Sequence, residues 1–485
     1  MVVMENRDRW VMHWDEVAVF DRNAASIGFN EMDMMRSAGE SLAEEAASMA
    51  GGGDVLFLCG PGNNGGDGFV ASCSDSLSGS RVSVISSHES SKTTCSSEAR
   101  ELARKSVDFH QWPSIPDGSW SLVVDCLLGA GASGPGASLR SPISDIVGWA
   151  QNLVAPVLAC DIPTGLGGPD CLVAEKTVTF HSLKSGMDSI ECGEVVVSEL
   201  PWSENVQYCG IGDACRYPPL VRNSRKGDRG RVLVIGGGPF HGAPILAGLA
   251  AARSGCDLVH VAMPAAAIGR SSWPSSLIPE ELPDVDYLTT NSIEALVGFF
   301  DSGRAPDSVV LGPGLGREEQ TVRAVQGIIE IASSRGTKVV IDADAIACLP
   351  SGQWPHRLTG VLTPHIGEAE RWLDGHSPED ALSKCKGEDQ AIVVTGPTDT
   401  LTGPEGRRAL AQGGHPRMAV GGTGDILAGI IGGLMAQGML PWPSARLGCA
   451  LLREAGRRAA EEKGPGTLAE DVPVHIAHTL ADWTR

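Results

Sequence analysis

Long apolar stretches and aromatic residues are scarce in this sequence. Aromatic residues make up 5% of the 485 residues, and no stretch approaches the roughly 18 consecutive apolar residues that span a bilayer. The first residues mix Glu5, Arg7, Asp8 and Arg9 with apolar side chains, so they lack the uninterrupted apolar core of a signal peptide. We therefore expect a cytoplasmic protein with no membrane contact.

Paired cysteines and an excess of positive charge are also missing. The 13 cysteines include no C-x-x-C pair and no Cys/His cluster at zinc spacing, so neither a disulfide framework nor a zinc knuckle is indicated, and a reducing compartment fits best. The 59 acidic and 38 basic residues give a net charge of −21, which repels the phosphate backbone of DNA or RNA. Nucleic acid is not an expected partner.

Glycine, by contrast, is abundant at 61 residues, and short β-branched runs alternate with helical patterns along the chain. This alternation predicts α/β architecture with parallel sheets. The periodicity fails over Pro201–Lys226, where prolines and glycines cluster. We therefore predict two three-layer α/β domains, residues 1–215 and 222–485, whose unlike motifs indicate a fusion. The expected strands are Val55–Cys59, Arg81–Ser86, Leu122–Asp125, Pro156–Cys160, Arg231–Ile235, Leu258–Ala262, Ser308–Leu311, Lys338–Asp342 and Gln390–Thr395, with a helix over Pro244–Ser254.

The first polar constellation follows the strand Val55–Cys59, where the chain reads G-P-G-N-N-G-G-D-G over residues 60–68. A glycine-rich loop at the carboxyl end of a strand exposes backbone N–H groups to a phosphate, and the next helix adds its positive end. The spacing is neither that of a dinucleotide fingerprint nor that of a Walker loop. A tight surface turn is the alternative reading of this loop taken alone.

Two further strand ends carry polar residues, Asp125 before a second glycine-rich loop and Asp161 in the run D-I-P-T-G. Carboxyl ends of parallel strands line one crevice, so these residues are expected to meet. Asn64, Asp125 and Thr164 supply hard oxygen ligands suited to an alkali or alkaline-earth cation, and Asp161 could hold a ribose or substrate hydroxyl. A single aspartate after a strand is usually a helix cap, so the prediction depends on the three loops together.

The second constellation lies near the C-terminus, where G-G-T-G-D over residues 421–425 opens a long apolar helix. The free N–H groups of a helix start can hold an anion, and the glycines allow close approach. Asp425 in the first turn is placed to accept a proton from a hydroxyl that attacks a phosphoryl group. The alternative is that Asp425 only caps the helix.

At this point the motifs resemble two families. G-P-G-N-N-G-G-D-G with D-I-P-T-G is similar to the NAD(P)H-hydrate epimerase domain, which implies a Rossmann-like fold over residues 1–215. The second half, with G-P-G-L-G at 312–316, T-P-H at 363–365 and the G-T-G-D motif, resembles the ADP- or ATP-dependent NAD(P)H-hydrate dehydratase, a ribokinase-like fold. The resemblance implies a bifunctional repair enzyme acting on NADHX and NADPHX, the hydrated forms of NADH and NADPH.

The resemblance also implies roles for individual residues. In the epimerase domain the hydrated cofactor would contact Asn63, Asn64, Gly65, Gly66, Asp67, Gly129, Ala130, Gly131, Ala132, Ser133, Gly134, Pro135 and Asp161, with potassium held by Asn64, Asp125 and Thr164. In the dehydratase domain the hydrate would contact Ala243, Gly314, His365 and Asp425, and the nucleotide would contact Thr395, Gly396, Pro397, Thr398, Asp399 and Gly424.

The sequence allows two interpretations at three positions. Lys184 matches a lysine that the epimerase family tends to keep, although an exposed lysine that ends a strand is equally ordinary. His365 taken alone is more often a hydrogen-bonded structural histidine. Thr395 stands where the family usually has a lysine, and a threonine cannot pair with a phosphate.

The implied chemistry has two steps, epimerisation of the R and S hydrates at C6 of the nicotinamide ring and nucleotide-dependent dehydration of the S hydrate. The expected cofactors are potassium in the first domain and ADP, or ATP, with magnesium in the second. ADP is favoured because fusions of this two-domain kind commonly use it, and a homo-oligomer is expected. The alternatives are a ribokinase-like small-molecule kinase joined to a scaffold domain and a nucleotide-binding module without catalysis.

Overall fold

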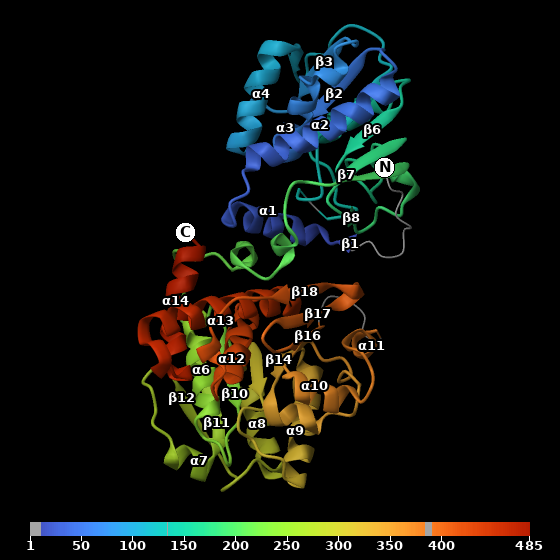
Figure 1. Ribbon diagram of the computed structural model, residues 1–485. Coiled ribbons are helices and arrows are strands. Elements are labelled where there is room, and N and C mark those ends of the chain that lie inside the picture. The colour runs from blue at the N-terminus through green and yellow to red at the C-terminus, as the bar shows by residue number, and fades with distance from the viewer. Residues whose placement is uncertain (1–10, 133, 384–389) are drawn as a thin grey trace. The chain divides into compact units, whose positions relative to one another are not determined.

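The structure is a computed structural model, and it describes residues 11–132, 134–383 and 390–485. The chain forms two compact units that divide between Val206 and Gln207. Each unit has its own sheet and its own hydrophobic core (Figure 1). None of the described helices is long and apolar enough to cross a membrane. The predicted architecture, two three-layer α/β units, is confirmed.

The first unit is built on a seven-stranded parallel sheet with the order β4-β3-β2-β5-β6-β7-β9. Its strands are β2 (Val55–Cys59), β3 (Val82–Ser86), β4 (Asp108–Gln111), β5 (Leu122–Cys126), β6 (Val157–Cys160), β7 (Lys176–Phe180) and β9 (Glu194–Ser198), and a separate short pair joins β1 (Val11–Met12) to β8 (Leu183–Lys184). The first six strands have the order of a doubly wound nucleotide-binding sheet, so the direction of winding reverses between β2 and β5.

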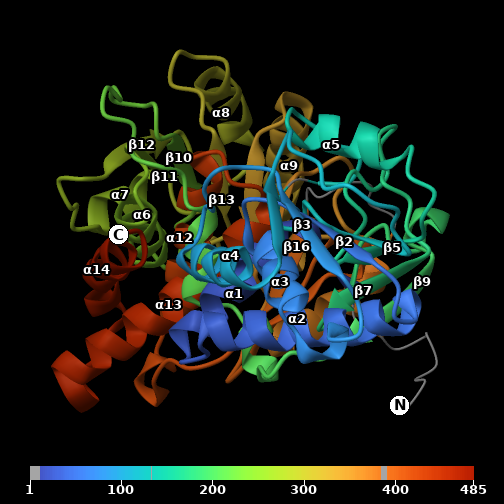
Figure 2. The same cartoon turned by 90° about the horizontal axis from the view of Figure 1, so that it is seen from above.

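Helices cover both faces of this sheet. One face packs against α2 (Glu31–Ala50), α3 (Asn63–Ser72) and α4 (Thr94–Ser106), the neighbouring blue helices of Figures 1 and 2, and the other packs against α5 (Ile143–Ala150). The short α1 (Val17–Ser26) precedes them. All residues of β2 and β5 are buried, which explains their nearly continuous apolar sequences.

The second unit contains a nine-stranded sheet with the order β12-β11-β10-β13-β14-β15-β16-β17-β18. Its strands are β10 (Arg231–Ile235), β11 (Leu258–Pro264), β12 (Ile278–Leu282), β13 (Ser308–Leu311), β14 (Lys338–Ile341), β15 (Gly360–Leu362), β16 (Gln390–Val394), β17 (Asp399–Thr402) and β18 (Arg408–Ala411). All neighbours are parallel except β16 with β17 and β17 with β18. The winding reverses between β10 and β13.

Two groups of helices enclose this sheet. One face packs against α6 (Ala243–Arg253), α12 (Thr423–Ala436), α13 (Pro441–Lys463) and α14 (Val472–Trp483). The other packs against α8 (Ile293–Phe300), α9 (Glu319–Arg335), α10 (Ile366–Leu373) and α11 (Pro378–Leu382), while α7 (Ala265–Arg270) follows β11 directly.

Glycine sets the position of α12 against α6. A Cβ at Gly429 would lie 2.1 Å from the carbonyl oxygen of Ala247, so only glycine permits this close packing of the two helices. Every residue from Ile426 to Ala436 is buried. This tight packing fixes the start of α12, where the predicted catalytic aspartate lies.

Candidate active sites

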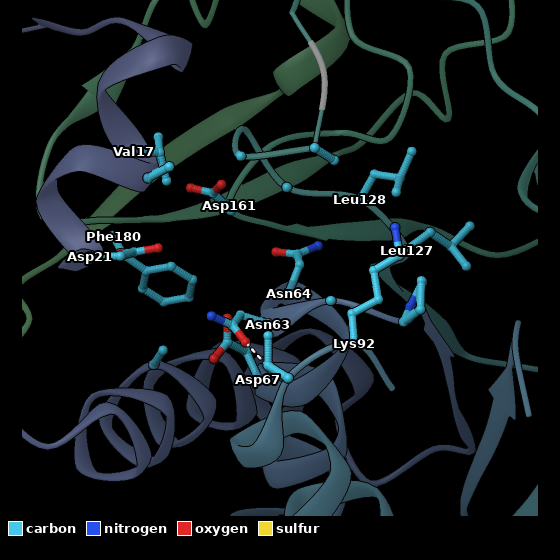
Figure 3. A pocket seen from close by; sticks show the side chains of 18 of the residues that line it. Val17, Asp21, Asn63, Asn64, Asp67, Lys92, Leu127, Leu128, Asp161 and Phe180 are labelled. Carbon is cyan, nitrogen blue, oxygen red and sulfur yellow. Dashed lines mark hydrogen bonds between the residues drawn. The ribbon is translucent and has the colours of Figure 1, made fainter. Parts of the chain in front are cut away.

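Three loops of the first unit meet at the carboxyl ends of β2, β5 and β6. They line a cavity of about 1040 Å³ beside the point where the winding reverses (Figure 3), which is where open α/β sheets bind ligands. The predicted substrate-binding residues that line it are Asn63, Asn64, Asp67, Gly129, Gly131, Ala132 and Asp161. The structure thus brings these predicted residues from three loops together at one edge of the sheet.

Other predicted residues of these loops do not line the cavity. A Cβ at Gly65 would lie 2.0 Å from the carbonyl oxygen of Gly60, and one at Gly66 would lie 2.5 Å from Met35 Cε, so both glycines permit close packing. The N–H of Ala130 donates a hydrogen bond to the carboxylate of Asp161 at 2.8 Å. Gly134 and Pro135 are exposed loop residues, and Ser133 lies outside the described residues.

Asp161 is paired with Lys184, the lysine whose role the sequence left open. Lys184 Nζ lies 2.9 Å from Asp161 Oδ1, and the lysine side chain is almost fully buried. The same ammonium group donates to Thr179 Oγ1 at 2.8 Å and to the carbonyl oxygen of Phe180 at 2.6 Å. Asp161 itself has a φ of 67°, a left-handed conformation that is unusual for a residue with a side chain. The fold thus holds this ion pair in one orientation at the cavity wall.

Asp125 is a fully buried carboxyl group that depends on hydrogen bonds. Its oxygens accept from Thr164 Oγ1 at 2.8 Å, from the N–H of Thr164 at 2.7 Å and from the N–H of Leu127 at 3.1 Å. Burial is the main cause that raises its pKa to about 6. Within the described ranges, no lysine, arginine or histidine pairs with Asp125.

Asn64 lies against the second glycine-rich loop. A Cβ at Gly129 would come within 3.0 Å of Asn64 Oδ1 and within 2.8 Å of Asp161 Oδ2, so only glycine leaves room for these two side chains. The amide nitrogen of Asn64 is buried and has no hydrogen-bond partner in the described part of the chain. Packing therefore holds the amide of Asn64 in place, and its nitrogen can still donate hydrogen bonds.

Two carboxyl groups in the cavity stand apart, because neither makes a hydrogen bond or ion pair with a described residue. They are Asp21 on α1 and Asp67 on α3, and Figure 3 shows both beside the space that Asn64 and Asp161 also border. Loss of hydration in the cavity, then the charges of Asp161 and Glu31, raises the pKa of Asp21 to about 6, against the positive charge of Lys184, which lowers it. Burial also raises the pKa of Asp67 well above its usual value, with Asp161 and Asp21 adding to the shift.

Asp67 was predicted as a substrate contact, whereas sequence reasoning missed Asp21. Asp21 lies on an ordinary helix ahead of the first long strand, with no glycine-rich loop beside it. No local signal in the sequence distinguishes it from a surface aspartate. Only the fold shows that α1 contributes to the cavity.

In the second unit, Asp425 lies in the first turn of α12. The helix begins after Gly422, whose φ of +100° requires glycine, and open space surrounds the positions where a Cβ would stand at Gly421 and Gly424. The first N–H groups of a helix have no acceptor within it, so they are available to an anion. Burial is the main cause that raises the pKa of Asp425 to about 6, and the charges of Asp344 and Glu368 add to it.

A second carboxyl group near Asp425 was not singled out from the sequence. Asp342 directly follows β14, is buried, and accepts a hydrogen bond from Thr363 Oγ1 at 2.7 Å. Burial raises its pKa to about 8, and the charge of Asp425 is the next largest cause. A Cβ at Gly312 would lie 1.8 Å from the carbonyl oxygen of Asp342, so the glycine-rich loop after β13 touches this residue directly.

Ala243 and Gly314, the predicted hydrate contacts, lie on either side of the point where the second sheet reverses. Ala243 is the first residue of α6, which follows β10. Gly314, in the loop after β13, has a φ of +69°, and a Cβ there would lie 2.0 Å from the carbonyl oxygen of Phe240. The loops after β10 and β13 therefore touch.

His365 occupies the N-cap of α10. Its Nδ1 accepts a hydrogen bond from the N–H of Gly367 at 3.0 Å, and its backbone N–H donates to Glu368 at 3.1 Å. The side chain is nevertheless 58% exposed. The cap accounts for Nδ1 and leaves the other ring nitrogen, 3.4 Å from Glu368 Oε1, at the surface.

The predicted nucleotide segment, Thr395 to Asp399, is held in place by Arg453 of α13. The guanidinium pairs with both carboxylate oxygens of Asp399 at 2.8 Å, and it donates to the carbonyl oxygens of Gly396 at 2.9 Å and Pro397 at 3.0 Å. The carboxylate of Asp399 is therefore already engaged. Sequence reasoning missed Arg453, because nothing in a helical run of charged and apolar residues marks one arginine as buried.

Comparison with known proteins gives the same two-part division. A family model described as "YjeF-related protein N-terminus" matches residues 31–186, and one described as "NAD(P)H-hydrate dehydratase" matches residues 232–477. Among solved structures, an ADP/ATP-dependent NAD(P)H-hydrate dehydratase from Bacillus subtilis, co-crystallised with ATP/Mg²⁺, is 23% identical, with a TM-score of 0.47. That match covers 58% of this chain and 100% of the other.

Full-length relatives carry the name "Bifunctional NAD(P)H-hydrate repair enzyme Nnr". The one from Hyperthermus butylicus is 34% identical over 96% of this chain and 91% of its own length. Those from Pyrobaculum aerophilum and Coxiella burnetii are 33% and 30% identical, over 94% and 95% of this chain and 95% and 97% of their own lengths. From its two α/β units and these matches along nearly its whole length, the chain belongs to the family of bifunctional NAD(P)H-hydrate repair enzymes, which combine an epimerase domain with a dehydratase domain.

Proposed function

We propose that residues 1–215 interconvert the R and S hydrates of NADH and NADPH at C6, and that residues 222–485 dehydrate the S hydrate with a nucleotide as phosphoryl donor. The observation that carries the proposal is Asp425, a carboxyl group without a cation partner among the described residues, at a helix start that can bind an anion. Its placement suits a general base that works beside a phosphoryl group.

Dehydration of the hydrate is slow unaided because hydroxide is a poor leaving group. Asp425 takes the proton of the C6 hydroxyl as that oxygen attacks the terminal phosphoryl group of the nucleotide, and the bond from this phosphorus to the bridging oxygen breaks, so that the shortened nucleotide leaves with the electron pair. The N–H groups of residues 421–424 hold the negative charge that develops on the transferred group. Phosphate then leaves from C6, a proton is lost from C5, and the ring double bond returns.

The surroundings of Asp425 fit a divalent cation. The charges of Asp344 and Glu368 raise its pKa, and carboxylate oxygens of Asp342 and Glu368 are the hard ligands that magnesium prefers. When bound, magnesium supplies charge neutralisation at the nucleotide phosphates. The residues that would face it are Asp342 and Glu368.

The first unit fits a monovalent cation in a similar way. Asp125 is a buried carboxyl group with no cationic partner among the described residues, and Thr164 Oγ1 and Asn64 Oδ1 are neutral oxygen donors from neighbouring loops. Potassium at Asn64, Asp125 and Thr164 would stabilise the ionised form of Asp125. The ion pair of Asp161 with Lys184 then offers fixed hydrogen-bonding groups for hydroxyls of the substrate.

For the nucleotide we propose ADP. The loop at Thr395 lacks the usual lysine, so the phosphate chain of the nucleotide has one positive charge less to bind. The preference is tested by saturating the enzyme with ADP or with ATP and comparing dehydration of the S hydrate. Markedly faster turnover with ATP would contradict the assignment.

A direct assay tests the whole proposal. The protein is incubated with purified R or S NADH hydrate plus ADP and magnesium, and recovery of the reduced-nicotinamide absorbance is followed. Recovery from both hydrates is expected, whereas a small-molecule kinase or a non-catalytic nucleotide-binding module gives none.

The domain division is tested with fragments. Residues 1–206 and residues 207–485 should each fold and keep one activity, because each unit has its own sheet and core. The cut lies before Asp213 and Ala214, since Asp213 forms a buried ion pair with Arg446 and Ala214 packs in the core of the second unit. Insoluble or inactive fragments would count against the proposed boundary.

The proposed location is the cytoplasm, and the proposed assembly is a homo-oligomer. All the described cysteines are free thiols, which fits a reducing compartment, and we place the protein in the cytoplasm as a homo-oligomer. Light scattering at several protein concentrations tests the oligomer, and a single-chain mass throughout would contradict it.

A further inference from the structure

The epimerase cavity holds more carboxyl groups than substrate binding explains. Four of them line it, namely Asp21, Glu31, Asp67 and Asp161. Asp161 is occupied by Lys184 and by the N–H of Ala130, and Glu31 accepts a hydrogen bond from Cys95 Sγ at 3.7 Å. Asp21 and Asp67 remain, and neither has a partner among the described residues.

The positive groups of the same cavity leave these two carboxyls unpaired. The basic side chains that line it are His88, Lys92, Arg140 and Lys184. Lys184 is engaged by Asp161, Thr179 and Phe180, and none of the other three forms an ion pair with Asp21 or Asp67. Asp21 is one of the negative charges that raise the pKa of Asp67, which favours a protonated Asp67 beside an ionised Asp21.

We propose that Asp21 and Asp67 are the acid–base pair of the epimerase, one protonated and one ionised in each turnover. This inference rests on the proposed epimerase function and names the residues that perform it. The two side chains come from different helices, α1 and α3 (Figure 3). Inversion at C6 needs one group where the hydroxyl leaves and another where water returns, and two separate helices can provide these.

The step balances without any other reactant. The protonated carboxyl gives its proton to the C6 hydroxyl oxygen, the C6–O bond breaks with its electron pair going to oxygen, and water leaves. The lone pair of ring N1 forms a double bond to C6. A water molecule then attacks C6 from the opposite face, the N1 lone pair is restored, and the ionised carboxyl takes the proton that this water loses. The pair ends with its proton on the other residue, ready for the reverse direction.

Asp161 is less suited to act as the proton donor or as the proton acceptor. Its oxygens already accept from Lys184 and Ala130, and an ammonium group 2.9 Å away opposes protonation of the carboxylate. Asp161 is therefore better suited to holding a hydroxyl of the substrate than to donating a proton.

The experiment compares Asp21→Asn, Asp67→Asn and Asp33→Asn with the wild type in the full-length protein. Asp33 is an exposed aspartate of α2 that does not line the cavity, which makes Asp33→Asn a matched control. Each protein receives pure R hydrate or pure S hydrate with ADP and magnesium. Epimerisation is measured above the uncatalysed rate, with kcat and KM determined separately and followed from pH 5 to pH 9.

We expect Asp21→Asn and Asp67→Asn each to lower kcat for epimerisation by about 10²–10⁴-fold, the usual contribution of a general acid or base. KM should change only a few-fold, and conversion of the S hydrate by the second domain should be unchanged. In wild type the rate should fall at both ends of the pH range, since one proton must be present. Asp21→Glu should recover part of kcat, because it restores a carboxyl group.

Several results would overturn the inference. One is an Asp21→Asn protein whose epimerisation kcat stays within a few-fold of wild type. A second is a loss that appears only in KM. A third is Asp21→Glu with no more activity than Asp21→Asn while the S hydrate is still dehydrated. A wild-type protein that does not interconvert the hydrates above the uncatalysed rate would instead refute the proposed epimerase function.

Discussion

The surroundings of Asp161 in the first site and of Asp425 in the second differ in charge. In the first unit, Asp161 is tied to a buried lysine at 2.9 Å and to a backbone N–H, so its charge is balanced and its direction is fixed. In the second unit, Asp425 faces other acidic groups, and its pKa is raised to about 6. A balanced carboxylate can hold a hydroxyl group, whereas an unbalanced one gains by taking a proton.

The difference follows from where each residue lies in its fold. Asp161 directly follows a strand, where the next strand and its loop can bring a lysine against it. Asp425 lies in the first turn of a helix whose buried side packs on α6, and the glycines before it leave space on the open side. Asp161 is thus positioned by an ion pair and suits hydrogen bonding, whereas Asp425 is positioned by a helix start and suits proton transfer.

The largest effect is expected from Asp425→Asn. Asparagine keeps the size of the side chain and a hydrogen-bond acceptor at the helix start, but it cannot take a proton. Dehydration of the S hydrate should fall by about 10²–10⁴-fold or more, while melting temperature, nucleotide binding and epimerisation persist. Near-normal turnover per folded molecule would instead show that Asp425 only caps the helix.

The next largest effect is expected from Asp125→Ala in the other site. The substitution removes the acceptor of three hydrogen bonds and leaves buried donors of Thr164 and Leu127 unpaired. Epimerisation and its dependence on potassium should be lost, while dehydration of S hydrate is retained by the second domain. Assays of both hydrates over a potassium titration test this, and equal loss of both activities would contradict the separation of the sites.

Much of the fold was predictable because buried parallel strands have a strong sequence pattern. Val55–Cys59, Arg231–Ile235 and Ser308–Leu311 begin and end as predicted. The strands that were not predicted include β12, β17 and β18, at or near the edge of the second sheet, where one side is exposed and the apolar run is broken. Their pairing depends on neighbours that are distant in the sequence.

The sites were predictable only where glycine marks a loop. The loops around Asn64 and Asp425 have recognisable glycine patterns, because backbones approach closely there. No such pattern marks Asp21, Asp342 or Arg453, because the groups that surround each of them come from distant parts of the sequence. Such residues can be found only once the tertiary structure places them.

The rate of dehydration should change by about tenfold per pH unit on the acid side of its pH profile. Asp425 must be ionised to act as a base, and its pKa of about 6 means that kcat/KM for dehydration should fall as the pH drops below about 6. Asp344→Asn removes the larger of the two charges that raise this pKa, so the fall should move to lower pH. Initial rates with S hydrate from pH 5 to pH 8 provide the measurement. An unshifted profile would show that Asp344 does not act on Asp425.

The smallest expected effect concerns stability, through Asp342→Asn. In the folded protein the pKa of Asp342 is about 8, well above the 3.8 of an ordinary aspartate, mainly because the side chain is buried. A carboxyl group with a raised pKa binds its proton more tightly when folded, so its contribution to stability is greatest at low pH. That contribution declines as the pH rises from about 4 towards about 8.

Asparagine has no charge to lose and can still accept the hydrogen bond that Thr363 donates at 2.7 Å. Asp342→Asn should therefore raise the melting temperature of the second domain more at pH 8 than at pH 5, by about 2–4 °C for each kcal/mol gained in a domain of this size. Asp286→Asn, at an exposed position, is the control and should show the same small shift at both values. An equal shift for Asp342→Asn at both values would mean that Asp342 is ionised in the fold throughout. In that case the two acidic groups of the second site would be alike, and the contrast with the balanced pair of the first site would rest on Asp425 alone.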